Sequence, residues 1–312
     1  MNARDLLILV IIGIVNAVVT HFLLRNFGLI LMKRGIIGLD VNKPDRPRIP
    51  EEGGIAITIS LSFSFILYAE LFGYHWMPLI ILTTILISLI GFVDHFRNLR
   101  PYPKLVYCAA VGSLYSIYYL FDTGSGMADA VLAFVLVATV YSLLVNSFNL
   151  LAGFNGLESG LAVISSGALG GYFLGKGLPH EASVAFLVAI SYAVSYRFNR
   201  YPAKLFLGNS GTFVPASIFV GLAVFSGEWL PVLIVMAPHL INAGIRLIST
   251  GVSSRSEFTP LDYRGGLLHL PADSYLSLIR MYLKSGPKRE QAIVHYVLAL
   301  ECGFCLLLFV LL

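Results

Sequence analysis

Residues 77–104 read MPLIILTTILISLIGFVDHFRNLRPYPK. The first part, residues 77–93, is almost wholly apolar, as expected of a helix that crosses a bilayer, which needs about 20 mostly apolar residues. Directly after it come Asp94, a histidine and a basic, proline-broken segment that ends at Lys104. This stretch therefore predicts a membrane-spanning helix followed by a short polar loop at one membrane face.

Apolar runs and polar loops alternate in this way over the whole chain of 312 residues. Hydrophobic residues make up 57% and charged residues only 12%, about half the charged share of globular proteins, which argues against a soluble protein. We predict an all-α polytopic membrane protein, with residues 1–312 forming a single integral membrane domain. Ten spanning helices are expected, near residues 5–29, 54–73, 77–93, 105–121, 128–145, 158–175, 182–198, 210–226, 230–248 and 291–312.

Lysine and arginine are sorted between two sets of loops. Nearly all of them lie in or beside the longer set, whereas Arg4 and Lys176 fall on the other side. The positive-inside rule places the longer loops in the cytoplasm and both termini outside. These loops cover residues 30–53, 94–104, 146–157, 199–209 and 249–290.

The last of these loops, residues 249–290, is the longest and has room for a small subdomain. Its segment LSLIRMYLKSGPKRE, residues 276–290, is typical of an amphipathic interfacial helix, with Arg280 and Lys284 on the polar face.

Charge and cysteine content exclude several classes of protein. The net charge of +4 is modest, so we expect no nucleic-acid partner. The three cysteines all lie in apolar runs, and their spacing indicates neither a disulfide framework nor a zinc site.

Each cytoplasmic loop carries a compact polar motif beside a helix end. KPDRPRIPEEGG, residues 43–54, ends in glycines that open a helix, where backbone amides can bind anions. In GFVDHFRNLRPYPKL, residues 91–105, a carboxylate at the membrane boundary is costly unless it is paired or binds a metal. Lys104 can serve as a point charge for a phosphate. A charged turn in the first motif and an interfacial salt bridge in the second are the alternatives.

The third motif is NSFNLLAGFNGLESG, residues 146–160. Asn146 and Asn149 share a helix face and could offer oxygens to a hard cation or hydrogen bonds to a base or phosphate. Hydrogen bonding between helices is the alternative. The fourth, YPAKLFLGNSGTF, holds a glycine-rich turn before a helix, which resembles an anion cradle, with a plain turn as the alternative. The last loop contributes Arg255, Arg264 and His269, with solvated charges as the alternative to phosphate contacts. Together the motifs indicate one site for phosphate, a divalent cation and a lipid-soluble partner.

In this order the motifs resemble those of the polyprenyl-phosphate N-acetylhexosamine-1-phosphate transferases. The chain is most similar to the eukaryotic and archaeal dolichyl-phosphate N-acetylglucosamine-1-phosphotransferases. The resemblance implies ten spanning helices and a cytoplasmic active site. It implies transfer of N-acetylhexosamine-1-phosphate, with N-acetylglucosamine the expected sugar, from a UDP-sugar to a polyprenyl (dolichyl) phosphate. UMP is the second product, and Mg²⁺, or Mn²⁺ in its place, is the implied cofactor. This would be the first membrane step of glycan assembly.

The resemblance also assigns roles to individual residues. Asp94, Lys104 and His95 fall in the catalytic motif, where His95 replaces the second aspartate of an acidic pair. The implied metal ligands are Asp94, Asn149 and Asn209, and Asn209 stands where the family has an aspartate. The implied substrate-binding residues, including those around uracil and those of the last basic motif, are Glu51, Asn146, Asn155, Phe206, Arg264 and His269.

Because of His95 and Asn209, a second hypothesis is a non-catalytic or altered-substrate paralogue that binds a sugar nucleotide or lipid phosphate. A third, a transporter, would place polar residues across the membrane instead of at one face. Short outer loops without a luminal insert favour an archaeal or bacterial plasma membrane over the endoplasmic reticulum. The family resemblance also makes a homodimer plausible.

Overall fold

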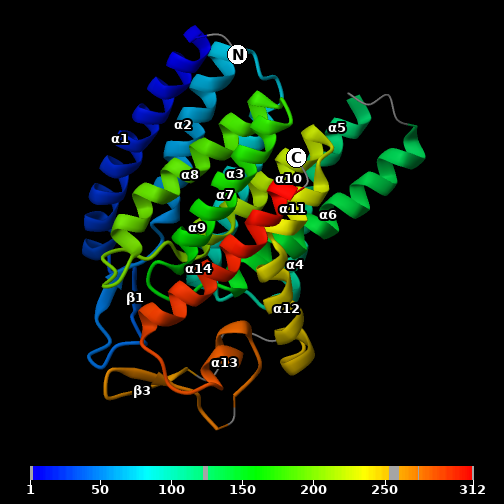
Figure 1. The fold of residues 1–312 in the computed structure, drawn as a ribbon. Coiled ribbons are helices and arrows are strands. Elements are labelled where there is room, and N and C mark those ends of the chain that lie inside the picture. Colours follow the sequence, from blue (N-terminus) through cyan, green and yellow to red (C-terminus); the bar gives the residue numbers. More distant parts are fainter. Residues whose placement is uncertain (1–2, 122–125, 253–259, 273, 311–312) are drawn as a thin grey trace.

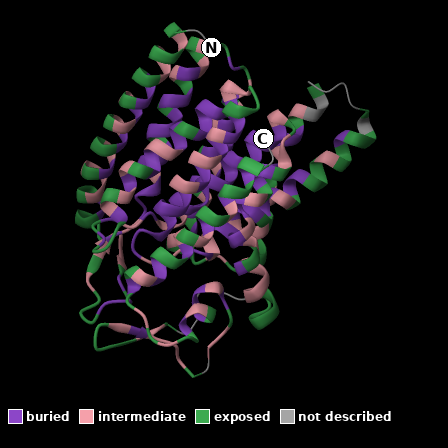
Figure 2. Ribbon diagram, in the orientation of Figure 1, coloured by how far each residue is buried: buried purple, intermediate pink, exposed green. Residues whose placement is uncertain are grey.

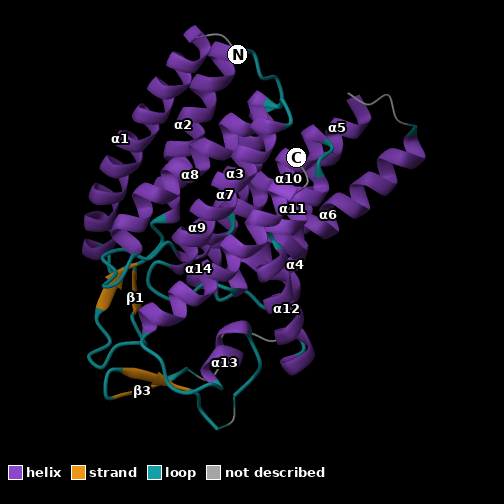
Figure 3. Cartoon of the chain, viewed as in Figure 1, coloured by secondary structure: helices purple, strands orange, loops and turns teal. Residues whose placement is uncertain are grey.

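The computed structural model describes residues 3–121, 126–252, 260–272 and 274–310. Helices dominate these residues, and the strands form two short hairpins (Figures 1 and 3). The helices are α1 (Ala3–Lys33), α2 (Gly54–Phe72), α3 (Met77–Arg97), α4 (Pro101–Gly112), α5 (Ser116–Phe121), α6 (Met127–Leu150), α7 (Leu157–Gly175), α8 (Pro179–Asn199), α9 (Gly208–Thr212), α10 (Val214–Ser226), α11 (Trp229–Val235), α12 (Ala237–Thr250), α13 (Leu278–Leu283) and α14 (Glu290–Leu306). The strands are β1 (Ile37–Leu39), β2 (Arg48–Pro50), β3 (Asp262–Arg264) and β4 (Leu267–His269).

The prediction of an all-α multi-pass membrane protein is confirmed. Among the described residues, 6 helices are long and apolar enough to cross a membrane, or 7 if the bent pair α11 and α12 forms one span. Within the described residues, each of the ten predicted segments coincides with helix, but several are shorter or broken, so the count of ten and the sidedness of the loops remain predictions.

The breaks have identifiable causes. The predicted segment 105–121 is divided between α4 and α5 near Gly112, where a Cβ atom would overlap the Tyr141 side chain of α6. Pro238 lies in the first turn of α12, where its missing N–H costs no hydrogen bond, and α12 there bends by 63° from α11.

The buried residues lie at the centre of the bundle (Figure 2), and polar residues join the helices there. Asn16 of α1 donates to the carbonyl of Leu187 in α8, at 2.8 Å. Its side-chain oxygen accepts hydrogen bonds from Ser60 and Ser64 of α2 and from Ser191 of α8, at 3.0–3.2 Å. Such bonds are typical of helix association in membranes.

The two hairpins lie at one end of the bundle, and both ends of the chain lie away from them (Figure 1). β1 pairs with β2 and β3 with β4, each in antiparallel register. The backbone of Leu268 exchanges hydrogen bonds with that of Lys288, just before α14, at 2.8 and 3.2 Å.

The expectation for Arg280 is wrong. The residues predicted as an interfacial helix form only the short α13, and Arg280 is buried beneath Tyr275, with its guanidinium carbon 3.8 Å from the ring centre. Stacking on an aromatic face is an alternative to solvation that the arginine guanidinium favours.

Candidate active site

The candidate site is built around the turn that begins α9. Backbone amides of Gly53 and Gly54 donate to the carbonyls of Phe206 and Leu207, both at 2.9 Å, so the start of α2 is bonded to this turn. A Cβ atom on Gly91 of α3 would lie 2.5 Å from the backbone of Asn209. Only glycine permits so close an approach, and these contacts bring three elements that are distant in sequence to one place.

Asp94 is the centre of this meeting point. Its Oδ1 accepts a hydrogen bond from the backbone N–H of Leu99 at 2.8 Å, which fixes the turn after α3. Its Oδ2 accepts from Lys104 Nζ at 3.2 Å and from the Asn209 side-chain amide at 2.6 Å. Lys104 of α4 and Asn209 of α9, both proposed from the sequence, therefore meet at the carboxylate of Asp94 on α3.

Asn149 reaches the same turn from α6. Its Oδ1 accepts a hydrogen bond from the Thr212 hydroxyl at 2.7 Å, and Thr212 is the last residue of α9. Asn146, one turn earlier on α6, donates instead to the carbonyl of Ser142 on its own helix at 2.8 Å. Of the two asparagines that share a face, only Asn149 is bonded to α9.

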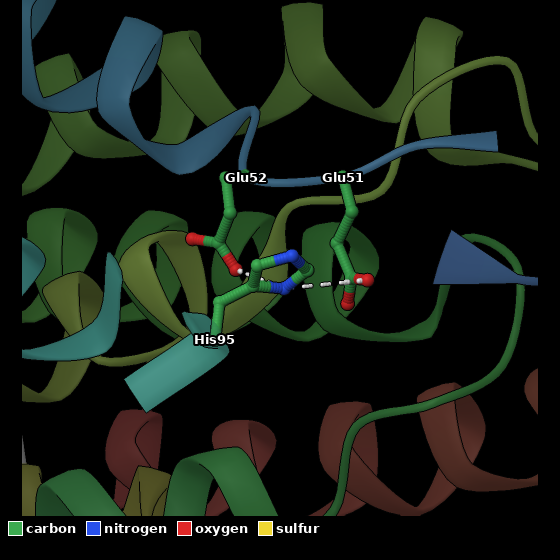
Figure 4. Close-up of side chains that lie close together, drawn as sticks. All are labelled: Glu51, Glu52 and His95. Atoms are coloured by element: carbon green, nitrogen blue, oxygen red, sulfur yellow. Dashed lines mark ion pairs between the residues drawn. The ribbon is translucent and has the colours of Figure 1, made fainter. Parts of the chain in front are cut away.

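Glu51, Glu52 and His95 form a second group beside Asp94. Figure 4 shows Glu51 and Glu52, from the segment before α2, and His95, from α3, converging on one point. His95 Nδ1 lies 3.6 Å from Glu51 Oε2 and 3.5 Å from Glu52 Oε1. The other oxygen of Glu52 accepts from the backbone N–H of Ser210 at 3.3 Å.

The Glu52 carboxyl is almost fully buried, with 1% of the residue exposed. Burial raises its pKa to about 8, the charge of Glu51 adds to the rise, and hydrogen bonds from Ser210 and Asn209 oppose it. A positive partner would favour the charged form of this carboxyl.

Phe206 lies with Glu51 on the other side of the turn. A Cβ atom on Gly38 of β1 would lie 2.5 Å from Glu51 Oε2 and 3.1 Å from Phe206 Cδ2, so the three residues pack together. The backbone amide of Phe206 donates to the carbonyl of Pro50 at 2.9 Å. The structure thus brings together two residues that the resemblance assigned to substrate.

Asn155 belongs to a separate buried network. Its backbone amide donates to Glu290 and its side-chain amide to Asp40, both at 2.9 Å. Lys43 Nζ bridges these two carboxylates, at 3.2 Å from Asp40 Oδ2 and in direct contact with Glu290. This network joins the loop between α1 and α2 to the starts of α7 and α14.

Arg264 and His269 lie on the second hairpin. Arg264 is exposed and pairs with Asp262 at 3.0 Å, and it lines a hollow of about 400 Å³ together with Lys43 and Arg46. Among the described residues, no contact joins Arg264 or His269 to the group around Asp94. Arg255 lies outside the described residues.

Comparisons with known proteins identify the family. The model of Glycosyl transferase family 4 matches residues 77–227. A Methanocaldococcus jannaschii protein named "Putative glycosyltransferase" is 32% identical over 91% of this chain and 89% of its own length. A protein of Saccharolobus solfataricus is 30% identical over 88% of each chain, and its name is "Putative UDP-N-acetylglucosamine--dolichyl-phosphate N-acetylglucosaminephosphotransferase". The chain belongs to glycosyl transferase family 4.

A third relative is more distant. The decaprenyl-phosphate N-acetylglucosaminephosphotransferase of Mycolicibacterium smegmatis is 25% identical over 69% of this family 4 chain and 58% of its own length. The matched region of the family model spans Asp94, Lys104, Asn149 and Asn209, the four residues that meet at α9.

Sequence reasoning missed several members of these groups. Glu52, Asp40 and Glu290 were not predicted as site residues, although each contacts a residue that was. Lys43 was not predicted either, and it reaches Asn155 only through Asp40 and Glu290. The signal for Glu52 was its place beside Glu51 in the quoted motif. Glu290 lies at the start of a helix, where the helix dipole favours any acidic residue. Its position in the sequence therefore did not indicate a role in the site.

The side chains around Asp94 fit the implied Mg²⁺ if a substrate diphosphate supplies further oxygen ligands. Asp94, Asn149 and Asn209 carry oxygens of the kind that Mg²⁺ uses, but Asp94 is the only carboxylate of the three, and its oxygens already accept three hydrogen bonds. Mg²⁺ is commonly held by one or two carboxylates together with substrate phosphates. These residues therefore fit a cation that arrives with a diphosphate.

Proposed function

We propose that this family 4 protein transfers N-acetylhexosamine-1-phosphate from a UDP-sugar to a polyprenyl phosphate and releases UMP. One observation carries the proposal. Asp94, Lys104 and Asn209 come from three different elements and meet within hydrogen-bonding distance beside a glycine-rich turn. The names of the relatives support the reaction class, and that of the Saccharolobus protein supports N-acetylglucosamine as the sugar and a dolichyl phosphate as the acceptor.

Transfer of the sugar phosphate requires that negative charge on the phosphates is neutralised and that the two substrates are positioned for attack. A phosphate monoester is largely dianionic at pH 7, so the lipid phosphate needs no strong base to act as a nucleophile. One of its oxygens bonds to the β-phosphorus, and the bond from that phosphorus to the bridging oxygen breaks, which leaves UMP. Lys104 holds a positive charge at the site, and Asp94 fixes the ammonium group in place.

The other residues have proposed roles that follow from their positions. Mg²⁺, or Mn²⁺ in its place, would be held by Asp94, Asn149 and Asn209 and would neutralise charge on the diphosphate. Glu51 and Phe206, packed together at Gly38, would line the nucleotide side. The remaining proposed substrate contacts are Asn146, Asn155, Arg264 and His269.

A direct test is UMP release by the purified protein from UDP-N-acetylglucosamine with polyprenyl phosphate and Mg²⁺. We expect turnover, and we expect Lys104→Gln to reduce it at least about 100-fold, because a preorganised charge at the reacting phosphate is lost. Lys176→Gln is the matched control, since Lys176 lies at the end of α7, beside Tyr172. No turnover with any UDP-sugar, together with retained nucleotide binding, would favour the non-catalytic paralogue.

The surroundings of the enzyme are also part of the proposal. The apolar helices require a lipid bilayer, and we propose the plasma membrane of an archaeon or a bacterium. We also propose a homodimer, which chemical crosslinking in membranes would detect.

A further inference from the structure

We propose that Glu51, Glu52 and His95 form a binding site for a divalent transition-metal ion, with Mn²⁺ preferred over Mg²⁺. The site is distinct from the ligands proposed around Asp94, and it exists without substrate. Its participation in sugar-phosphate transfer rests on the function proposed above, whereas its capacity to bind the ion does not.

The geometry is that of a metal site. One ligand atom from each of the three side chains lies within 4.8 Å of the others. The Nδ1 atom of His95 is 3.6 and 3.5 Å from the two carboxylates, which is longer than a strong hydrogen bond. Ligand atoms that surround one ion at about 2.0–2.3 Å are themselves separated by roughly 3–3.5 Å. Small side-chain shifts would therefore close the three residues on an ion.

The charge balance of the group also favours a cation. Two adjacent carboxylates face each other across one imidazole, and Glu52 is almost completely removed from solvent. The nearby positive charge of Lys104 is already paired with Asp94. A desolvated carboxylate is costly unless a proton neutralises it or a cation compensates it, and a divalent ion that displaces the proton would supply two charges at this point.

The backbone holds the group in place. His95 lies in the last turn of α3, whose position is fixed by the contact of Gly91 with the α9 turn. Glu52 has a φ of 79°, a left-handed conformation that is unfavourable for residues other than glycine. Glycine would adopt this conformation without strain. The glutamate found here instead places its carboxylate 3.5 Å from His95 Nδ1.

The ligand types select the metal. Mg²⁺ prefers oxygen ligands and retains several waters. Imidazole suits transition-metal ions and carboxylates suit Mn²⁺ as well as Mg²⁺, so a mixed set of two carboxylates and one imidazole favours Mn²⁺ over Mg²⁺. Three protein ligands also leave coordination positions open for water or a phosphate oxygen. His95 stands where the resemblance implies an aspartate, so the replacement would change which ion is preferred and would not remove the site.

The test is Mn²⁺ binding to the full-length protein in detergent, after chelation of bound metals and without nucleotide or lipid. Electron paramagnetic resonance of free Mn²⁺ gives the bound fraction. We expect binding of about one ion per chain, weakened at least tenfold in Glu52→Gln and in His95→Gln. Glu70→Gln, at an exposed position near the other end of α2, should bind as the parent does. His95→Asp should retain binding and shift the preference toward Mg²⁺.

The proposal would be overturned if the parent did not bind Mn²⁺. It would also be overturned if Glu52→Gln and His95→Gln bound Mn²⁺ as tightly as the parent does. Circular dichroism and thermal unfolding of each variant show whether it has folded, and His95→Asp tests the same position with a residue that retains a ligand. If the parent binds Mn²⁺ through these residues but releases no UMP, the metal site stands and the proposed transferase activity fails. If UMP is released and Glu52→Gln binds Mn²⁺ normally, the activity stands and the metal site fails.

Discussion

The contact of Gly91 with the α9 turn makes Gly91→Ala a sharp perturbation of the site. A Cβ atom at this position would lie 2.5 Å from the carbonyl carbon and oxygen of Asn209 and from the amide nitrogen of Ser210. Ordinary van der Waals contact begins at 3.4 Å, and the opposing atoms are backbone, which cannot rotate away. The last turns of α3 must therefore separate from α9 by about 1 Å.

The consequence for catalysis can be estimated from one hydrogen bond. Asp94 lies one helical turn beyond Gly91, and its Oδ2 is 2.6 Å from the Asn209 amide. A displacement of about 1 Å would stretch this contact beyond hydrogen-bonding range. A misplacement of that size can reduce the rate about 100-fold. Overpacking costs about 1–3 kcal/mol, which the higher helix propensity of alanine offsets by about 1 kcal/mol.

The assay compares UMP release with thermal unfolding in detergent. We expect Gly91→Ala to lose at least about 100-fold in activity with a loss of up to about 2 kcal/mol in stability. Gly167→Ala is the matched control, because Gly167 lies within α7 and a Cβ atom there would meet nothing within 4 Å. Equal activity and stability in the two variants would refute the idea that the close approach of α3 to α9 is required.

Asn209→Asp should steepen the Mg²⁺ dependence of UMP release, because a carboxylate would replace the amide that lies 2.6 Å from Asp94; an unchanged response would contradict this account. Asp94→Asn should lower UMP release at least about 100-fold and shift thermal unfolding only slightly; retained activity would exclude Asp94 from the reaction. Lys43→Met should destabilise the protein by about 3–5 kcal/mol in thermal unfolding. Adding Glu290→Gln should recover part of this loss, and no recovery would show that the pair is not coupled.

Much of the fold follows from composition and hydrophobic run length. The run at residues 77–93 predicted α3 closely, and the one at 54–73 predicted α2, because each is a continuous apolar helix. The run at 105–121 is divided between α4 and α5, and α4 ends at Gly112, which lies too close to Tyr141 of α6 for a side chain. No local pattern reveals this tertiary contact.

The site, like the fold, was predicted from the sequence only in part. Asp94, Lys104, Asn149 and Asn209 could be named from motifs, and the structure brings them to one turn. The bridge from Lys43 to Glu290 spans 247 positions in sequence, so no spacing argument could pair them. Arg280 was misplaced for a similar reason, since helical periodicity could not foresee that Tyr275 covers it.

The resemblance implies that Asn209 replaces an aspartate, and this has a physical consequence for the site without substrate. An aspartate there would put two carboxylates in contact at Asp94, an arrangement that is unfavourable without a proton or a cation between them. The amide of Asn209 donates a hydrogen bond instead, so Asp94 and Lys104 keep their geometry without a metal ion.

The cation proposed above lies instead at the neighbouring group, where Glu51 and Glu52 face His95 and no lysine or arginine among the described residues pairs with them. The two replacements that the resemblance implies, His95 and Asn209, would then be linked. Asn209 would free the turn at α9 from a standing requirement for metal, and His95 would add a nitrogen ligand to the neighbouring carboxylate pair. With the metal site proposed above, the smaller number of carboxylates around Asp94 would be compatible with an enzyme that holds its metal ion at the start of α2.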